Sequence, residues 1–113
     1  MNFGLTMETY EKILNLIEKY PDLEFKVFGS RARGDYKDGS DIDIAIFGEA
    51  CEDTKFHVLN EFDLLDIPYQ VDVVFVKDIR KPEFLESIER DGVKFKWIDL
   101  MKEKKILIAH TKG

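Results

Sequence analysis

Three aspartates in apolar, strand-like segments are the residues of this chain that could bind a metal ion. Asp41 and Asp43 open the run DIDIAIF, and Asp72 lies inside the run QVDVVFV. Because the side chains of an extended strand alternate between its two faces, Asp41 and Asp43 share a face and lie about 6 to 7 Å apart along it. If the two segments are neighbouring strands, all three carboxylates converge at one place.

A convergent group of carboxylates needs a counter-ion. Two like charges about 4 Å apart repel by roughly 4 kcal/mol at an effective dielectric constant of about 20. Hard oxygen ligands select Mg²⁺ or Mn²⁺, and two such ions can hold phosphate oxygens during an in-line displacement. A single aspartate is more simply interpreted as the cap or edge of a strand. The set of three favours phosphoryl or nucleotidyl transfer.

Gly29 and Ser30 follow the apolar segment 24–28 and could form the phosphate-binding half of the same site. A glycine lets the backbone approach a phosphate closely, and we expect Gly29 to serve this approach rather than the fold. The Ser30 hydroxyl and the following N–H groups can face anionic oxygens. Arg31 and Arg33 add positive charge beside them. A Gly-Ser pair alone is a common strand-to-turn junction and carries little weight.

The order of these motifs resembles that of a known superfamily. Gly29-Ser30, ten residues and then Asp41-Ile42-Asp43 are similar to the GSx10DxD signature of the DNA polymerase beta-type nucleotidyltransferases, and Asp72 matches their third carboxylate. The form GSRARG and the short chain resemble the minimal nucleotidyltransferases (MNT), which are commonly encoded beside a helical HEPN-domain protein in toxin–antitoxin pairs. The resemblance covers roughly residues 14 to 97.

This resemblance implies an enzyme that transfers AMP from ATP to an acceptor hydroxyl, with Mg²⁺ or Mn²⁺ as cofactor. Asp41 and Asp43 would hold the metal ions, and Asp72 would hold the second ion and act as base toward the acceptor. Without an acceptor-binding domain in the chain, a partner must present the acceptor. In the MNT branch, the partner would be a HEPN toxin encoded nearby and the acceptor a tyrosine hydroxyl, so a hetero-oligomer is expected.

The resemblance also assigns the phosphate-binding residues. Gly29 and Ser30 would bind the β- and γ-phosphates, and Arg31 or Arg33 would neutralise the leaving pyrophosphate. Two alternatives stay open. The chain could be a non-catalytic, nucleotide-binding antitoxin subunit that occludes its partner, although Asp72 favours catalysis. It could also be a small-molecule nucleotidyltransferase acting on an antibiotic, an activity that usually needs a second domain or a dimer cleft.

The length of 113 residues suits one core, so we expect a single nucleotidyltransferase domain over residues 1–113. The predicted class is α/β (α+β), with a small mixed β-sheet of about four strands flanked by helices, as in the polymerase beta-like fold. The predicted strands are 24–28, 41–46, 70–76 and 93–97, and the predicted helices are 6–20, 52–66 and 82–90. A short helical turn is expected within 32–40, and a docking helix or partner contact within 98–113.

Two of the predicted helices have distinct signals. Thr6 is a plausible N-cap for the first. The second is expected to cover the sheet with an apolar stripe made of Phe56, Leu59, Phe62 and Leu65.

The composition of the chain indicates which kinds of partner and which cellular location to expect. The 17 basic and 23 acidic residues give a net charge of −6, which disfavours an extended nucleic-acid-binding surface. A single cysteine, Cys51, excludes an internal disulfide. The amino terminus shows no leader pattern, and no apolar run approaches the roughly 20 residues of a membrane span. We therefore expect a cytoplasmic protein without a membrane partner.

Overall fold

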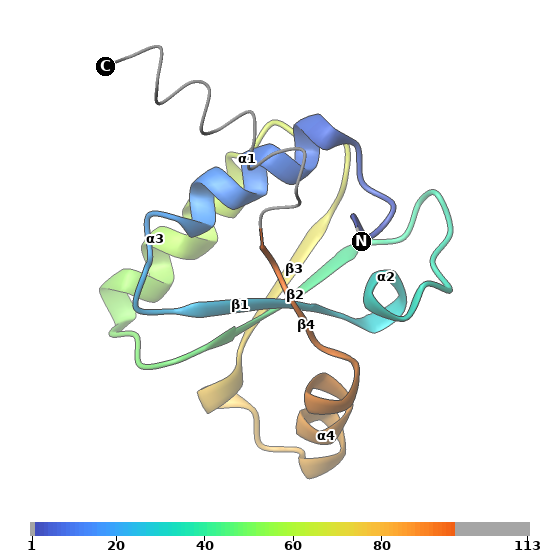
Figure 1. The fold of residues 1–113 in the computed structure, drawn as a ribbon. Coiled ribbons are helices and arrows are strands. Elements are labelled where there is room, and N and C mark those ends of the chain that lie inside the picture. Colours follow the sequence, from blue (N-terminus) through green and yellow to red (C-terminus); the bar gives the residue numbers. More distant parts are fainter. Residues whose placement is uncertain (1, 97–113) are drawn as a thin grey trace, which may run out of the picture.

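Four strands form one mixed sheet between helices in the computed structural model, which describes residues 2–96 (Figure 1). Along the chain the elements are α1 (Met7–Ile17), β1 (Glu24–Phe28), α2 (Gly29–Arg33), β2 (Ile42–Phe47), α3 (Glu52–Asp63), β3 (Val71–Phe75), the 3₁₀ helix η1 (Val76–Asp78), α4 (Pro82–Asp91) and β4 (Val93–Lys94). The strand order is β3-β2-β1-β4. The predicted class and the mixed four-stranded sheet are confirmed.

The strand β2 lies inside the sheet, between β1 and β3. It pairs with β1 in antiparallel and with β3 in parallel register. β1 also pairs with the edge strand β4, which within the described residues spans Val93–Lys94 instead of the predicted 93–97. The helix α3 lies between β2 and β3 in the chain, as a parallel pair requires a long crossover connection.

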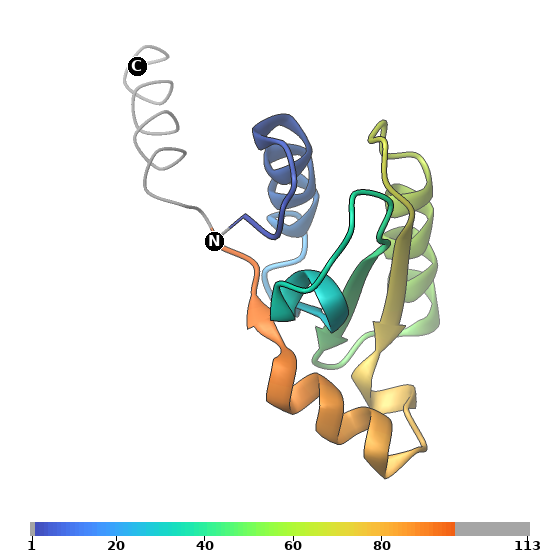
Figure 2. The same cartoon turned by 90° about the vertical axis from the view of Figure 1, so that its right-hand side faces the viewer.

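The two faces of the sheet are covered by different helices. Figure 1 shows α1 and α3 above the sheet and α4 below it, and α4 again lies at the opposite end from α1 in the view turned by 90° (Figure 2). Ile42, Ile44 and Ile46 belong to the main core with residues of α1 and α3. Ala45 belongs to a second, smaller cluster with Ile88 of α4. Asp43 alternates with the isoleucines and therefore lies on the α4 face.

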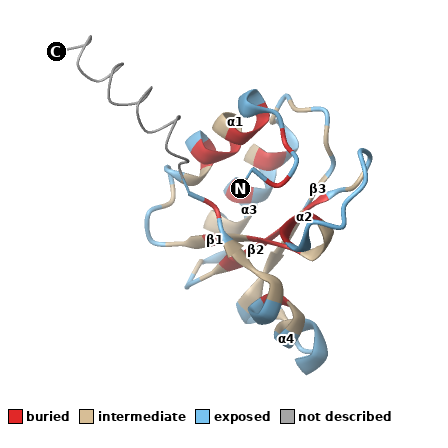
Figure 3. Ribbon diagram, turned by 45° about the vertical axis from the view of Figure 1, so that its right-hand side comes forward, coloured by how far each residue is buried: buried red, intermediate tan, exposed pale blue. Residues whose placement is uncertain are grey.

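The helix α1 begins and packs as its sequence predicted. Thr6 is the N-cap, and its side-chain oxygen accepts a hydrogen bond from the Thr9 N–H at 3.2 Å. Tyr10 and Ile13 are buried in the main core with the isoleucines of β2, and buried residues appear in red along α1 in Figure 3. The Tyr10 hydroxyl also donates to the Lys96 carbonyl oxygen at 2.7 Å, which ties the segment after β4 to this helix.

The helix α3 corrects the predicted stripe. It ends at Asp63 rather than near residue 66, and its buried residues are Val58 and Phe62. Phe56 is 67% exposed and Leu59 is 41% exposed. The three-residue steps on which the stripe was based follow a helical face only approximately, because an α-helix turns once in 3.6 residues.

Two further predictions concern the loop before β2 and the end of the chain. The helical turn predicted within residues 32–40 begins earlier, since α2 starts at Gly29 directly after β1. The docking helix or partner contact predicted for residues 98–113 lies outside the described residues. None of the helices within residues 2–96 has the length and apolar character that crossing a bilayer requires.

Candidate active site

The parallel pairing of β2 and β3 places two of the three aspartates side by side. Asp43 and Asp72 are direct partners in the register of the two strands, and neighbouring strands lie about 4.8 Å apart. Asp41 is the residue immediately before β2, and its charge reaches Asp43. The sheet thus places Asp43 beside Asp72 on the α4 face, with Asp41 just before the start of β2.

Asp43 is the most enclosed of the three carboxylates. It is half-buried, whereas Asp41 and Asp72 are exposed. Burial raises the pKa of Asp43, repulsion from Asp72 and then Asp41 raises it further, and the positive charge of Arg33 opposes the shift. A carboxylate with a raised pKa beside two others gains from a bound cation, which would neutralise the repulsion.

The oxygen donors at this place fit Mg²⁺ or Mn²⁺ in chemical type. Among residues 2–96, no three His, Cys, Asp or Glu side chains already stand together at metal-binding positions. Asp41 and Asp72 are exposed, so their side chains have room to change rotamer toward the half-buried Asp43. The residues present are therefore compatible with a divalent cation held by Asp41, Asp43 and Asp72.

Gly29 lies against the Asp43 carboxylate. Its φ is +71°, and a Cβ atom added to it would lie 2.5 Å from Asp43 Oδ2. The positive φ and the close approach both require glycine, so this residue serves the turn as well as any bound phosphate. The expectation that Gly29 has no role in the fold is corrected. Ser30 follows at the start of α2 and is half-buried.

Arg31 lies elsewhere than the sequence suggested. Its side chain is only 1% exposed, and its guanidinium donates hydrogen bonds to the backbone carbonyl oxygens of Phe3, Asp38 and Ser40. An arginine whose donors are used in this way inside the protein does not face a phosphate in solvent. The structure therefore does not support the expected contact between Arg31 and pyrophosphate.

Arg33, unlike Arg31, is exposed and lies near the carboxylates. It is exposed at the end of α2, and it pairs with Asp35 at 3.2 Å and with Asp91 of α4 at 3.4 Å. Its charge also lowers the pKa of Asp43, so it lies within electrostatic reach of the carboxylates. Of the two arginines, Arg33 is the one that the structure brings to the site.

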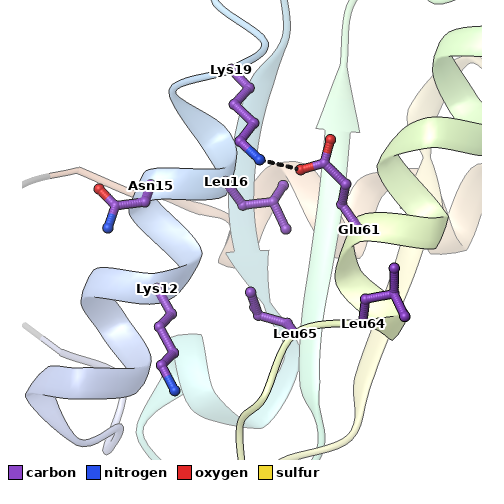
Figure 4. A pocket seen from close by; sticks show the side chains of 7 residues that line it. All are labelled: Lys12, Asn15, Leu16, Lys19, Glu61, Leu64 and Leu65. Atoms are coloured by element: carbon purple, nitrogen blue, oxygen red, sulfur yellow. Dashed lines mark hydrogen bonds and ion pairs between the residues drawn. The ribbon is translucent and has the colours of Figure 1, made fainter.

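A groove of about 390 Å³ lies on the other face of the sheet, between α1 and α3 (Figure 4). Leu16, Leu64 and Leu65 form its apolar wall, and the ion pair of Lys19 with Glu61 crosses it at 3.0 Å. The helices that line it cover the face opposite Asp43. This groove is therefore not part of the carboxylate site.

Sequence reasoning missed the way in which the loop before Asp41 is held. The ring of Tyr36, within this loop, and the ring of Tyr69, before β3, both lie about 5 Å from the Arg31 guanidinium, at 5.0 and 4.9 Å. No spacing in the sequence signals these contacts, because they join residues from three separate segments.

Comparison with known proteins places this geometry in a family. Residues 11–99 match the family described as "Polymerase beta, Nucleotidyltransferase". A protein of Methanocaldococcus jannaschii, provisionally named a protein adenylyltransferase, is 39% identical over 88 residues, which are 75% of this chain and 86% of that protein.

Two solved structures share the fold. A chain of a toxin–antitoxin complex with AMP-PNP is 19% identical with a TM-score of 0.58, and the match covers 92% of this chain and 98% of that one. A chain of the complex between a tri-AMPylated Shewanella oneidensis HEPN toxin and an MNT antitoxin is 19% identical with a TM-score of 0.54, over 95% and 88%. The carboxylate geometry, the family match and the 39% identical relative together show that this chain belongs to the polymerase beta nucleotidyltransferase family.

Proposed function

We propose that this nucleotidyltransferase transfers AMP from ATP to a tyrosine hydroxyl of a helical HEPN-domain partner. The observation that carries the proposal is the pairing of Asp43 with Asp72 in the parallel register of β2 and β3, with Gly29 against the Asp43 carboxylate. The name of the Methanocaldococcus jannaschii relative supports protein as the acceptor. The AMPylated HEPN toxin in the complex with an MNT antitoxin supports the kind of partner.

In the proposed reaction, the acceptor oxygen attacks the α-phosphorus of ATP. The new bond joins this oxygen to phosphorus, and the bond from the α-phosphorus to the leaving pyrophosphate breaks. Asp72 accepts the proton of the hydroxyl, which is the role of a general base. Asp41, Asp43 and Asp72 would hold Mg²⁺ or Mn²⁺, which supplies charge neutralisation at the phosphate oxygens when bound.

The other residues of the site would bind and orient the triphosphate. The backbone at Gly29 has no Cβ and can approach the β- and γ-phosphates, and the Ser30 hydroxyl would donate to one of their oxygens. Arg33, which is exposed and close enough to act on Asp43, would neutralise the leaving pyrophosphate. Its pairing with Asp35 and Asp91 holds it near the site before ATP binds.

The acceptor would come from the partner, because the family domain matches residues 11–99 and the residues that would bind the phosphates lie on one face of its small sheet. Docking would bring the hydroxyl to about 3 to 3.5 Å from the α-phosphorus, where positioning alone removes several kcal/mol of the barrier. A cytoplasmic location and a hetero-oligomer with the partner belong to the same proposal.

The experiment combines the purified pair with ATP and Mg²⁺ and weighs the partner by intact-mass spectrometry. Each transfer should add one adenylyl unit, localised to a tyrosine by peptide mapping, and Asp41→Asn or Asp72→Asn should abolish it. Asp63→Asn, which removes an exposed carboxylate from the end of α3, is the matched control and should leave transfer intact. If the partner binds tightly but its mass stays constant with every nucleoside triphosphate, the chain is a non-catalytic antitoxin that occludes its partner.

A further inference from the structure

The buried guanidinium of Arg31 contacts the segments that precede two of the site aspartates. We propose that Arg31 is a positioning residue, which fixes the backbone segments that carry Asp41 and Asp72 beside Asp43, so that the three carboxylates can reach a shared metal ion. The inference rests on the proposed nucleotidyl transfer and goes beyond it, since it assigns the placement of the metal ligands to a side chain that touches neither metal nor ATP.

The first set of contacts fixes the residue before Asp41. Arg31 Nε and Nη2 donate to the Ser40 carbonyl oxygen at 3.0 and 2.9 Å, and Nη2 also lies 3.4 Å from the Asp38 carbonyl oxygen. Arg31 stands directly after Gly29-Ser30 in the chain. The guanidinium therefore ties the glycine–serine half of the site to the backbone from which Asp41 projects.

The remaining hydrogen bonds of this loop are local. Within residues 2–96, the Lys37 N–H donates to Ser40 Oγ at 2.8 Å and the Ser40 N–H donates to the Lys37 carbonyl oxygen at 3.0 Å, while Asp35 pairs with Arg33. These bonds shape the turn without attaching it to the sheet. Arg31 joins this loop to the start of the chain, because its Nη1 also donates to the Phe3 carbonyl oxygen at 3.0 Å. The Tyr36 ring adds a packing contact with Gly4.

The second set of contacts reaches the strand that carries Asp72. The Tyr69 ring, three residues before Asp72, lies 4.9 Å from the Arg31 guanidinium, and the Tyr36 ring lies 5.0 Å from it. Next to Tyr69, the Gln70 carbonyl oxygen accepts from the Ile42 N–H at 2.8 Å, which joins the starts of β2 and β3. Arg31 thus contacts both the segment before β2 and the segment before β3.

Only an arginine can make this set of contacts. Its planar fork supplies several donors in fixed directions and its flat face stacks on aromatic rings, whereas a lysine ammonium is a point charge that cannot do both. Arg31→Lys keeps the positive charge and removes the fork. It therefore separates the geometric role of the guanidinium from its charge.

The test measures Mn²⁺ affinity in the presence of AMP-PNP, together with transfer kinetics at increasing Mn²⁺. We expect Arg31→Lys to remain folded and to weaken Mn²⁺ binding by about 10- to 100-fold, the range for residues that orient metal ligands. Its turnover should recover toward that of the wild type at saturating Mn²⁺. Hydrogen exchange at the Ile42 amide should become faster, because that amide donates to the Gln70 carbonyl oxygen, next to the Tyr69 that contacts Arg31. Arg80→Lys, at an exposed arginine, is the matched control and should change none of these.

The outcomes separate this inference from the proposed function. If the wild type binds Mn²⁺ with AMP-PNP and transfers AMP while folded Arg31→Lys keeps the same Mn²⁺ affinity, the role of Arg31 is overturned and the function stands. If the wild type neither binds nor transfers, both are overturned. If Arg31→Lys does not fold, Tyr69→Leu decides by the same measurements, because it retains the guanidinium and removes one ring from it: weaker Mn²⁺ binding supports the inference, and unchanged binding overturns it.

Discussion

The half-buried Asp43 shows how single residues of this site oppose folding in the absence of a cation. Burial raises its pKa above the usual value of 3.8, and repulsion from Asp72 and Asp41 adds to the shift. The folded protein therefore holds this proton more tightly than the unfolded chain does. The free energy of unfolding consequently falls as the pH rises above about 3.8 and through the folded pKa, and the loss is complete once the pH is well above the folded pKa.

We therefore predict that Asp43→Asn, without metal at pH 7, melts a few degrees above the wild type, and that this advantage disappears below about pH 4. With Mn²⁺ and ATP the order should reverse, because only the wild type binds them. Thermal melts across the pH range measure both effects, with Asp63→Asn as the control carboxylate. A metal-free Asp43→Asn that melts below the wild type at pH 7 would contradict the unfavourable charge assigned to Asp43.

Two glycines with positive φ separate backbone strain from contact with the site. Gly29 has φ +71° and meets Asp43 Oδ2, whereas Gly34 has φ +95° and open space around an added Cβ. Alanine at either position should cost about 1 to 2 kcal/mol of stability through backbone strain. Gly29→Ala should also displace the Asp43 carboxylate and weaken Mn²⁺ binding, while Gly34→Ala should leave that affinity unchanged. Calorimetric titration and denaturant melts test the pair, and equal Mn²⁺ affinities in the two variants would refute a role for the Gly29 contact.

At the scale of elements, one carboxylate joins α3 to the segment after α1. Glu61 accepts hydrogen bonds from the Tyr20 hydroxyl at 2.7 Å and from Lys19 Nζ at 3.0 Å. These bonds, that from Tyr20 first, hold the pKa of Glu61 below its usual 4.5. Burial and Glu61 together raise the pKa of Tyr20 to about 12. The link therefore stabilises the fold above about pH 4.5 and weakens as the pH falls through the lowered pKa of Glu61.

We predict that Glu61→Gln lowers the free energy of unfolding by about 1 kcal/mol at pH 7, since the lost hydrogen bonds involve a charged group that is partly open to solvent. The difference should shrink toward pH 3, where Glu61 is increasingly protonated in both states. Denaturant unfolding at the two pH values provides the comparison. Glu52→Gln on the same helix, where the side chain is 92% exposed, should have little effect at either. A loss that stays constant with pH would point to packing instead of charge.

At the scale of the whole molecule, the site joins parts of the chain that fold together only in the complete sheet. The turn after β1, the start of β2 and the strand β3 each contribute to it. A ligand held by all three should stabilise the entire domain and not one loop. By linkage, the gain is about 2.7 kcal/mol at a free ligand concentration one hundred times the Kd.

We accordingly predict that Mn²⁺ with AMP-PNP raises the melting temperature of the wild type by roughly 10 °C at that excess, given the size of the domain. Asp41→Asn should melt close to the ligand-free wild type under the same conditions. Scanning calorimetry measures the shift, and titration calorimetry supplies the Kd. Tight binding without a rise in melting temperature would mean that the ligand is held by a part of the chain that opens independently.

Patterns local to the chain were enough to predict most of the elements, the fold class and the family. The strand 24–28 and the N-cap at Thr6 lie where they were predicted, and the sheet is the mixed, four-stranded one that was expected. The resemblance to nucleotidyltransferases is confirmed by the family match over residues 11–99. These features were predictable because period-2 alternation, capping and motif spacing depend on residues close together in the chain.

Which strands and side chains are neighbours followed from the packing of the whole domain. The sequence required β3 to neighbour β2 without showing that it does, and the parallel register settles that Asp43 faces Asp72. Arg31 and Arg33 could not be told apart from the sequence. In the structure Arg31 is buried under the loop before Asp41, whereas the charge of Arg33 reaches Asp43. Phe56 looked like core and is exposed. Each of these outcomes depends on contacts between segments distant in the chain, and on which of several chemically similar side chains the packed core can accommodate, so local patterns carry no information about them.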